Sequence, residues 1–356
     1  MKKWTTVAIA IVAVIAVAGA ATAEYLTSSG SSNPCAGVDL GLPSGNSSAA
    51  VEAHSPHTLA VTGPGATSRI SGGFSPSTTG PIPVVAAENF WGSLVSQLGG
   101  NQTSVLSIVT DPNADPHEYE ANTSDAQAIA SAQYVIVNGV GYDDWALQLI
   151  AADGNANQVV LNVGNLNGVT VGGGVVSGNP HMWYNPSYVN ATVAAMYSDL
   201  VTIRPSATGI FQTNYAALNA SLGSLYGRAN EIKAQFAGTP VAATEDIFVY
   251  LANYTHLDLV SPPEFMEAVA EGNDPPTQSV VQFQCQLESG KVSVLVYNEQ
   301  TVTPTTENLK SIATSNHVAV VGITETIQPP DVTFQVWMNA EYLALQNALN
   351  SNALGQ

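Results

Sequence analysis

From residue 82 onward, short apolar runs alternate with segments in which apolar residues recur every three or four positions. In the first half the runs are PVVAAE, SVLSIV and YVIVNG, each followed by such a segment, and then QVVLNV, followed by a glycine-rich loop at 164–179. The rhythm returns with TPVAATE, KVSVLVYN and HVAVVGIT, and helices are predicted near 277–289, 305–314 and 331–350. Short buried strands separated by helices are typical of βαβ units and a parallel sheet.

Between these two halves, residues 206–238 have the most regular pattern in the chain. Apolar side chains recur there at spacings of three and four, no proline interrupts them, and Gly238 provides a stop signal. The stripe consists of Phe211, Tyr215, Leu218, Leu222, Leu225, Ala229, Ile232 and Phe236. We therefore predict an α/β fold with two lobes of parallel sheet flanked by helices, at 82–205 and 239–356, joined by one long connecting helix.

The first 81 residues do not follow this rhythm. Two lysines precede an unbroken apolar run from Val7 to Ala20, and the sequence Ala-Thr-Ala ends at residue 23, which is typical of a secretory signal peptide. Residues 1–23 are therefore predicted to be a signal peptide or, if uncleaved, an N-terminal anchor that keeps the protein near a membrane. Residues 24–81, rich in Ser, Gly, Pro and Thr, are predicted to be a flexible tether. The protein is expected to be exported, to the periplasm or the cell surface.

The chain carries little charge, and most of that charge is negative. Only 10% of its 356 residues are charged, with 8 Lys and Arg against 27 Asp and Glu and a formal net charge of −19. Nucleic-acid binding needs a basic face that neutralises phosphates, and this chain has too few cations to form one. The two cysteines, Cys35 and Cys285, lie in the tether and in the second half, and a fixed disulfide between them is not expected.

Four residues with metal-binding side chains follow predicted strands or the glycine-rich loop. They are His117 after SVLSIV, His181 after the loop, Glu245 at the end of TPVAATE and Glu325 at the end of HVAVVGIT. Ligands of open parallel α/β sheets bind beyond the carboxyl ends of the strands, so we expect the facing lobes to close the four side chains around one ion. Two imidazoles and two carboxylates without a thiolate suit Zn²⁺, Mn²⁺ or Fe²⁺.

Four further residues near these positions are expected to support the ligands. Asn138 and Asn298 can hydrogen-bond them, and Tyr142 and Trp183 can form a drier surrounding. Each ligand candidate also has an ordinary interpretation, because a histidine after a strand is usually a surface or capping residue and a lone glutamate suits a helix N-terminus. The prediction of a metal site therefore depends on all four candidates, because each follows a predicted strand or the glycine-rich loop.

Five segments, taken together and in this order, resemble one family: DPHEYE at 115–120, NGVGYDDW at 138–145, NPHMWYNP at 179–186, TEDIFVYLANY at 244–254 and VVGITET at 320–326. Over residues 82–350 the chain is similar to the zinc- and manganese-binding solute-binding proteins of ABC importers, the TroA-like metal receptors. The resemblance implies two lobes with a rigid connecting helix, and it places His117, His181, Glu245 and Glu325 at the four ligand positions. It also implies a binding protein without catalytic residues that carries one divalent metal ion to a membrane permease and its ATPase. A monomer is expected.

The resemblance leaves the identity of the metal open. The family often has Asp where Glu325 stands, and its zinc-specific members often have a third His where Glu245 stands, together with a His-rich loop. The loop at 164–179 contains no His, Asp or Glu. The segment ENFWG at 88–92 matches a sub-group of zinc or manganese receptors, so zinc, manganese and iron all stay candidates.

Two other functions compete with metal transport. A metallohydrolase would use His117 and His181 as ligands and Glu118 as general base, but four protein ligands leave no open position for water, and no HExxH segment occurs. The sequence argues only weakly against a surface adhesion protein in which the metal stiffens the two lobes.

Overall fold

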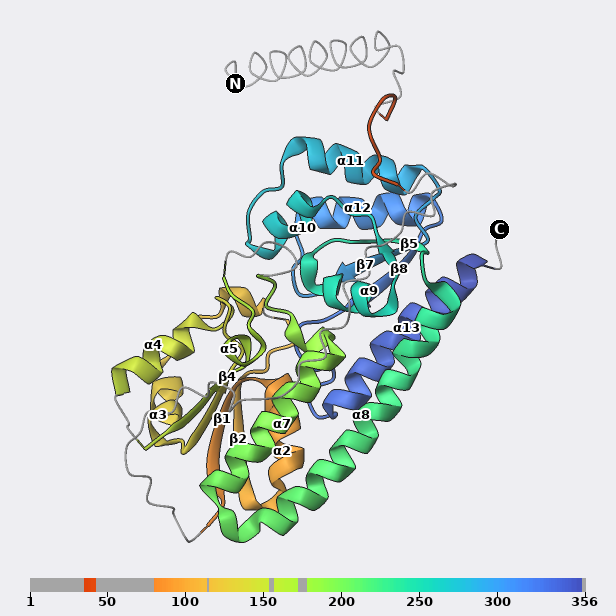
Figure 1. Ribbon diagram of the computed structural model, residues 1–356. Helices are drawn as coiled ribbons and strands as arrows, with labels where there is room; N and C mark the ends of the chain where they lie inside the picture. The colour runs from red at the N-terminus through yellow and green to blue at the C-terminus, as the bar shows by residue number, and fades with distance from the viewer. Residues whose placement is uncertain (1–34, 43–79, 114, 154–156, 172–177, 354–356) are drawn as a thin grey trace, which may run out of the picture. The chain divides into compact units, whose positions relative to one another are not determined.

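The computed structural model describes residues 35–42, 80–113, 115–153, 157–171 and 178–353 (Figure 1). The chain divides into two compact units, residues 1–39 and residues 40–356, and the elements below all belong to the second. The predicted signal segment 1–23 and most of the predicted tether lie outside the described residues. Within the described residues, no helix combines the length and the apolar character needed to cross a membrane.

The first sheet contains four parallel strands in the order β2-β1-β3-β4. They are β1 (Ile82–Glu88), β2 (Thr103–Val109), β3 (Tyr134–Val137) and β4 (Val159–Asn162). Alternate residues of β1 face opposite sides, as the two-residue period of a strand requires. Val84 and Ala86 join one apolar cluster and Val85 and Ala87 join another, so both faces of β1 are covered.

Helices cover both faces of this sheet. They are α2 (Asn89–Gly99), α3 (Thr123–Ser131), α4 (Asp144–Asp153), α5 (Val163–Asn167) and α7 (Pro186–Ile203). Side chains of α2 and α7 pack in one apolar cluster, and those of α3 and α4 pack in the other. Burial on both faces explains why the central strands β1 and β3 are apolar runs without alternation.

The second sheet repeats the arrangement of the first, with parallel strands in the order β6-β5-β7-β8. Its strands are β5 (Pro240–Ala243), β6 (Asp258–Leu259), β7 (Val294–Asn298) and β8 (Ala319–Ile323). Its helices are α9 (Val249–Thr255), α10 (Pro263–Ala270), α11 (Thr277–Glu288), α12 (Pro304–Ser315) and α13 (Phe334–Ala353). The two halves thus share one strand order although the sequence shows no clear repeat.

A helix of 29 residues, α8 (Thr208–Phe236), connects the two sheets (Figure 1). At about 1.5 Å per residue it spans about 44 Å. It begins after a 3₁₀ turn, η4 (Pro205–Ala207), and packs against α2 and α7 of the first half and α13 of the second. The predicted apolar stripe is buried except for Tyr215, which is half-buried and stacks on Tyr197. The predicted fold class is therefore confirmed.

Two predictions from the sequence need correction. The loop predicted at 164–179 begins with a helical segment, α5, because Asn162 caps it at one end and Gly168, at φ +69°, ends it. Residues 172–177 lie outside the described residues. Neither cysteine is a free thiol, so the expectation of unbridged cysteines is wrong. Separation along the sequence gives no measure of distance in the fold, and an exported protein can keep a disulfide.

Residues 40–42 of the predicted tether contact the second half of the fold. The side-chain amide of Gln286, on α11, donates a 2.7 Å hydrogen bond to the carbonyl oxygen of Leu40. Leu42 packs on the apolar cluster that contains Phe283 and Leu287. Leu40 and Leu42 therefore have fixed contacts, which a flexible tether over the whole of 24–81 does not predict.

Candidate metal centre

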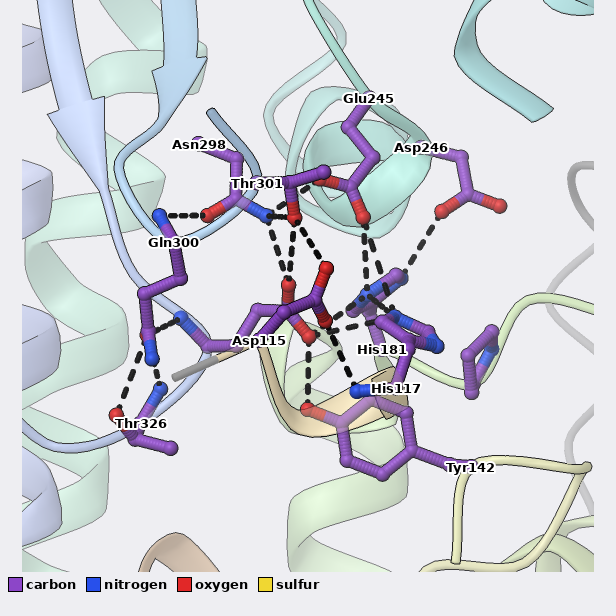
Figure 2. A network of polar contacts seen from close by, with 12 residues as sticks. Asp115, His117, Tyr142, His181, Glu245, Asp246, Asn298, Gln300, Thr301 and Thr326 are labelled. Carbon is purple, nitrogen blue, oxygen red and sulfur yellow. Dashed lines mark hydrogen bonds and ion pairs between the residues drawn. The ribbon is translucent and has the colours of Figure 1, made fainter. Parts of the chain in front are cut away.

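The four ligand candidates lie beyond the carboxyl ends of strands from both sheets. His117 belongs to the 3₁₀ turn η2 (Pro116–Glu118) that follows β2, and His181 immediately precedes the turn η3 (Met182–Tyr184). Glu245 and Glu325 each lie two residues after a strand, β5 and β8 respectively. One ligand atom from each of the four lies within 4.8 Å of the others. Figure 2 labels three of these residues, His117, His181 and Glu245. The structure therefore brings the predicted set together.

The distances between these atoms are close to those between the ligands of a single small ion. Nε2 of His117 lies 3.3 Å from Nε2 of His181 and 3.3 Å from Oε2 of Glu325. Nε2 of His181 lies 3.6 Å from the same glutamate oxygen, and both imidazole nitrogens lie 3.9 Å from Oε1 of Glu245. A tetrahedral ion with bonds of about 2.1 Å separates its ligands by about 3.4 Å. The four side chains are thus already close to the spacing that such an ion requires.

One of these atoms lacks the partner that burial demands. Oε1 of Glu245 is buried and accepts no hydrogen bond, although unpaired buried carboxylate oxygens are costly. The side chains of His181, Glu245 and Glu325 are 0% exposed, whereas that of His117 is 20% exposed. A cation bound among the four side chains would give the unpaired oxygen a partner. Such an ion would enter from the side of His117, the only partly exposed member of the four.

The ring of His181 is held in one orientation. Its Nδ1 lies 2.9 Å from Oδ1 of Asn179 and 3.0 Å from Oδ1 of Asp246, and both are acceptors. Nδ1 therefore carries the hydrogen of the neutral ring, so that loss of the second proton leaves the lone pair of Nε2 facing His117 and Glu325. Metal-binding histidines are usually oriented by such an acceptor on the other ring nitrogen.

The charges of the site are coupled. Burial disfavours the imidazolium of His181, but hydrogen bonds to Asp246 and Glu325 overcome this and raise its pKa to about 10. Burial and the charge of Glu325 raise the pKa of Glu245 to about 8. Burial acts in the same direction on Glu325, but the two histidines outweigh it and hold its pKa well below the usual range. Near neutral pH the metal-free site therefore keeps protons on His181 and Glu245.

Both carboxylates share one supporting residue. The side-chain nitrogen of Asn298, at the end of β7, donates hydrogen bonds to Oε2 of Glu245 and, at 2.7 Å, to Oε1 of Glu325. The hydroxyl of Tyr142 donates to the other oxygen of Glu325 at 2.8 Å, and its ring contacts the edge of His117. These two predicted supporting residues thus touch the ligand side chains directly.

The other two predicted supporting residues lie behind His181. Asn138 donates a 2.9 Å hydrogen bond to the carbonyl oxygen of Pro180 and accepts one from the indole of Trp91. The ring of Trp183 lies with its edge toward His181, at 5.2 Å between centroids, and stacks on Phe90. Asn138 therefore supports the backbone before His181, and Trp183 supplies an apolar wall.

Sequence reasoning missed several polar residues of the site. Asp246 and Asn179 orient His181, and both lie within the quoted motifs at 244–254 and 179–186, so the motifs contained a signal for them. Oε1 of Gln300 accepts hydrogen bonds from the backbone nitrogens of Glu325 and Thr326, at 2.7 and 2.9 Å, which fixes the loop of that ligand. Thr301 and Asp115 complete the network that Figure 2 shows. No spacing in the sequence pointed to Gln300 or Thr301.

A cavity of about 370 Å³ opens beside His117. Its wall includes Tyr142 and carboxylates from both halves of the fold: Asp115, Glu118, Asp246, Glu267 and Glu271. Such an acidic wall attracts cations and raises their local concentration. Glu118, the general base of the hydrolase hypothesis, is exposed in this wall and is not one of the four clustered side chains.

Comparison with known proteins finds metal-binding relatives of this chain. The family model ZnuA, described as the periplasmic component A of a zinc-uptake complex, matches residues 84–348. The manganese-binding lipoprotein MntA of Halalkalibacterium halodurans is 28% identical over 151 residues, which are 40% of this chain and 47% of that protein. The aligned part of this chain thus spans about half the length of that curated relative.

Two solved structures share the fold. The periplasmic zinc-binding protein TroA from Treponema pallidum has a TM-score of 0.64 and 15% identity, covering 76% of this chain and 99% of its own. A mutant of the laminin-binding adhesin Lmb from Streptococcus agalactiae has a TM-score of 0.62 and 17% identity, covering 75% and 99%. The predicted resemblance to TroA-like metal receptors is confirmed. Since the family match spans well over half of the chain, the protein belongs to the ZnuA family of periplasmic zinc-uptake components.

Proposed function

We propose that this protein captures one divalent transition metal ion, zinc or manganese, between its two lobes and delivers it to the permease and ATPase of an ABC importer. The observation that carries the proposal is the cluster of His117, His181, Glu245 and Glu325, whose ligand atoms lie within 4.8 Å of one another, close to the spacing that one ion requires. The unpaired Oε1 of Glu245 supports it, since a cation is the partner that this atom lacks.

Capture rather than catalysis suits the donor set. Catalytic zinc sites keep three protein ligands and an open position for water, whereas here four protein atoms converge. Three of the four side chains are 0% exposed, so a substrate would have little access to an ion bound among them. The proposed role therefore needs binding and release only, with His181, Glu245 and Glu325 shielded from water and His117 at the opening.

The export of the protein is part of the same proposal. The signal-like segment 1–23 supports placement outside the cytoplasm, either free in a periplasm or anchored at a cell surface. The similarity of MntA, a lipoprotein by name, and of Lmb, an adhesin by name, keeps surface attachment and adhesion as a second candidate function. Genes for a permease and an ATPase beside this one would favour transport over adhesion.

Calorimetric titration of the metal-free protein with Zn²⁺ and with Mn²⁺ tests the proposal. We expect one ion per chain, and loss of binding in a His117→Ala, Glu245→Gln double variant. A matched control changes the same residue types at exposed positions, His256→Asn and Glu264→Gln, and should bind like the parent. Asparagine suits position 256, which has φ +58°. Binding that survives in the double variant would place the metal elsewhere.

A further inference from the structure

The two carboxylates of the metal centre present one oxygen each toward the histidines. Oε1 of Glu245 and Oε2 of Glu325 lie within 3.3 to 3.9 Å of the imidazole nitrogens. The opposite oxygens, Oε2 of Glu245 and Oε1 of Glu325, both accept hydrogen bonds from Nδ2 of Asn298. Hydrogen bonds to these second oxygens favour binding of an ion through the two oxygens that face the histidines.

The orientation of the Asn298 amide is fixed by its own backbone surroundings. Its Oδ1 accepts a 3.0 Å hydrogen bond from the backbone nitrogen of Gln300, so the amide nitrogen must point toward the carboxylates. The hydroxyl of Thr301 lies 3.0 Å from the same nitrogen and adds a weak 3.4 Å contact to Oε1 of Glu325. Asn298 is 1% exposed, so water does not compete for its two amide hydrogens.

The nearest additional carboxylates are also engaged. Asp115 accepts a 2.9 Å hydrogen bond from the backbone nitrogen of His117 through Oδ1, and its Oδ2 lies 3.4 Å from the hydroxyl of Thr301. Oδ1 of Asp246 faces Nδ1 of His181 at 3.0 Å. The four clustered side chains therefore converge through one atom each, two nitrogens and two oxygens.

Coordination number separates the two candidate metals. Zn²⁺ is commonly held by four protein atoms in a tetrahedron, whereas Mn²⁺ suits sites of six oxygen-rich ligands. We propose that Asn298 sets the metal selectivity of this site by withholding Oε2 of Glu245 and Oε1 of Glu325, which keeps the site four-coordinate and favours zinc over manganese. This inference rests on the proposed function, because it concerns the same four ligands.

Zinc binds more tightly than manganese to most sites of this kind, so the affinity for zinc alone does not test the proposal. The test is a change in the ratio of the manganese to the zinc dissociation constant. Dissociation constants for Zn²⁺ and Mn²⁺ are measured for the parent, for Asn298→Ala and for Asn298→Asp, with Asn316→Ala as an exposed control. Asn298→Asp keeps an acceptor for the Gln300 nitrogen and loses the donor, so it covers the case in which the alanine variant fails to fold. We expect the ratio of the manganese to the zinc dissociation constant to fall at least about tenfold in both variants.

The absorption spectrum of bound Co²⁺ supplies an independent readout. The parent should show the intense visible bands of four-coordinate Co²⁺, and the variants should show weaker bands as carboxylate oxygens join the ion. If both metals weaken by the same factor and the ratio stays within about twofold of the parent, Asn298 only positions the ligands and the selectivity proposal is wrong. If the parent binds neither metal, the proposed function itself fails, which distinguishes the two outcomes.

Discussion

The hydroxyl of Tyr184 lies 2.6 Å from Oε2 of Glu341 and also 2.9 Å from the carbonyl oxygen of Thr324. Oε1 of Glu341 accepts a 3.0 Å hydrogen bond from the backbone nitrogen of Thr324. Tyr184 stands three residues after His181, and Thr324 directly precedes Glu325. One carboxylate on α13 therefore connects the two loops that carry a histidine and a glutamate of the metal centre.

Replacing Glu341 with leucine should disturb both loops. The change leaves the Thr324 nitrogen without its acceptor, a loss of about 1–3 kcal/mol in the free energy of unfolding. Since His181 and Glu325 lose a common support, metal affinity should also fall about tenfold. Calorimetric titration and urea denaturation measure the two effects.

The control for this variant is Leu345→Ala, which removes a buried side chain, 2% exposed, from the same helix. It should cost about 2–5 kcal/mol of stability and leave metal affinity within about twofold. Equal affinities in Glu341→Leu and Leu345→Ala would show that Glu341 serves stability alone.

Metal binding should release protons. His181, with a pKa of about 10, and Glu245, with a pKa of about 8, both hold protons in the metal-free site near neutral pH. An ion must displace these protons, so affinity should rise with pH and fall in acid. Titration at pH 7 in buffers of different ionisation enthalpy should reveal the release of at least one proton per ion. A binding enthalpy that is the same in every buffer would contradict this assignment of protons.

The elements of the fold are largely predictable because their physical causes are local. Burial on both faces makes strands such as β1 and β7 continuous apolar runs, and the period of α8 leaves one apolar stripe from Phe211 to Phe236. The positions of His117, His181, Glu245 and Glu325 follow from strand ends, since parallel strands place their carboxyl ends along one edge.

The supporting contacts are less predictable, because they depend on how distant loops meet. Asn298 and Tyr142 are anticipated as neighbours of the ligands, but nothing in the sequence shows that Asn298 faces both carboxylates at once. Gln300 and Glu341 act across sequence separations of 25 and 17 residues, through backbone nitrogens that leave no side-chain pattern. The sequence does not reveal that the two sheets share one strand order, because burial requires apolar residues but not the same residues in both halves.

Substitution within the stripe of α8 should affect stability without affecting the site. Leu222 is 1% exposed in the core that α8 shares with the sheets and α13, so Leu222→Ala should lower the free energy of unfolding by about 2–5 kcal/mol. Leu343, 41% exposed on α13, is the matched control, and Leu343→Ala should cost less than about 0.5 kcal/mol. Metal affinity should be unchanged in both variants at temperatures where they are folded. A large loss of affinity in Leu222→Ala would mean that α8 also sets the geometry of the ligands.

The stability of the metal-free protein should depend on pH through Glu341. Burial outweighs the hydrogen bonds from Tyr184 and Thr324 and raises its pKa from the ordinary 4.5 to about 8. The single hydroxyl hydrogen of Tyr184 faces two acceptors, so a proton on Glu341 satisfies the second contact. The facing hydroxyls of Tyr184 and Tyr342 have pKa values raised well above 10 by burial, so they stay neutral in this range.

Between pH 4.5 and 8 the folded protein therefore holds a proton at Glu341 that the unfolded chain releases. Stability from this group is complete at pH 4.5 and below, and it is lost as the pH rises toward 8, by an amount on the order of a few kcal/mol. Glu341→Gln has no such proton, so the parent's advantage over this variant should shrink between pH 5 and pH 8. Chemical denaturation at both pH values measures this difference in the free energy of unfolding. The exposed Glu264→Gln is the control, and its stability should change with pH as that of the parent does. Parallel pH profiles for the parent and Glu341→Gln would mean that the carboxyl is already ionised in the folded protein at pH 5.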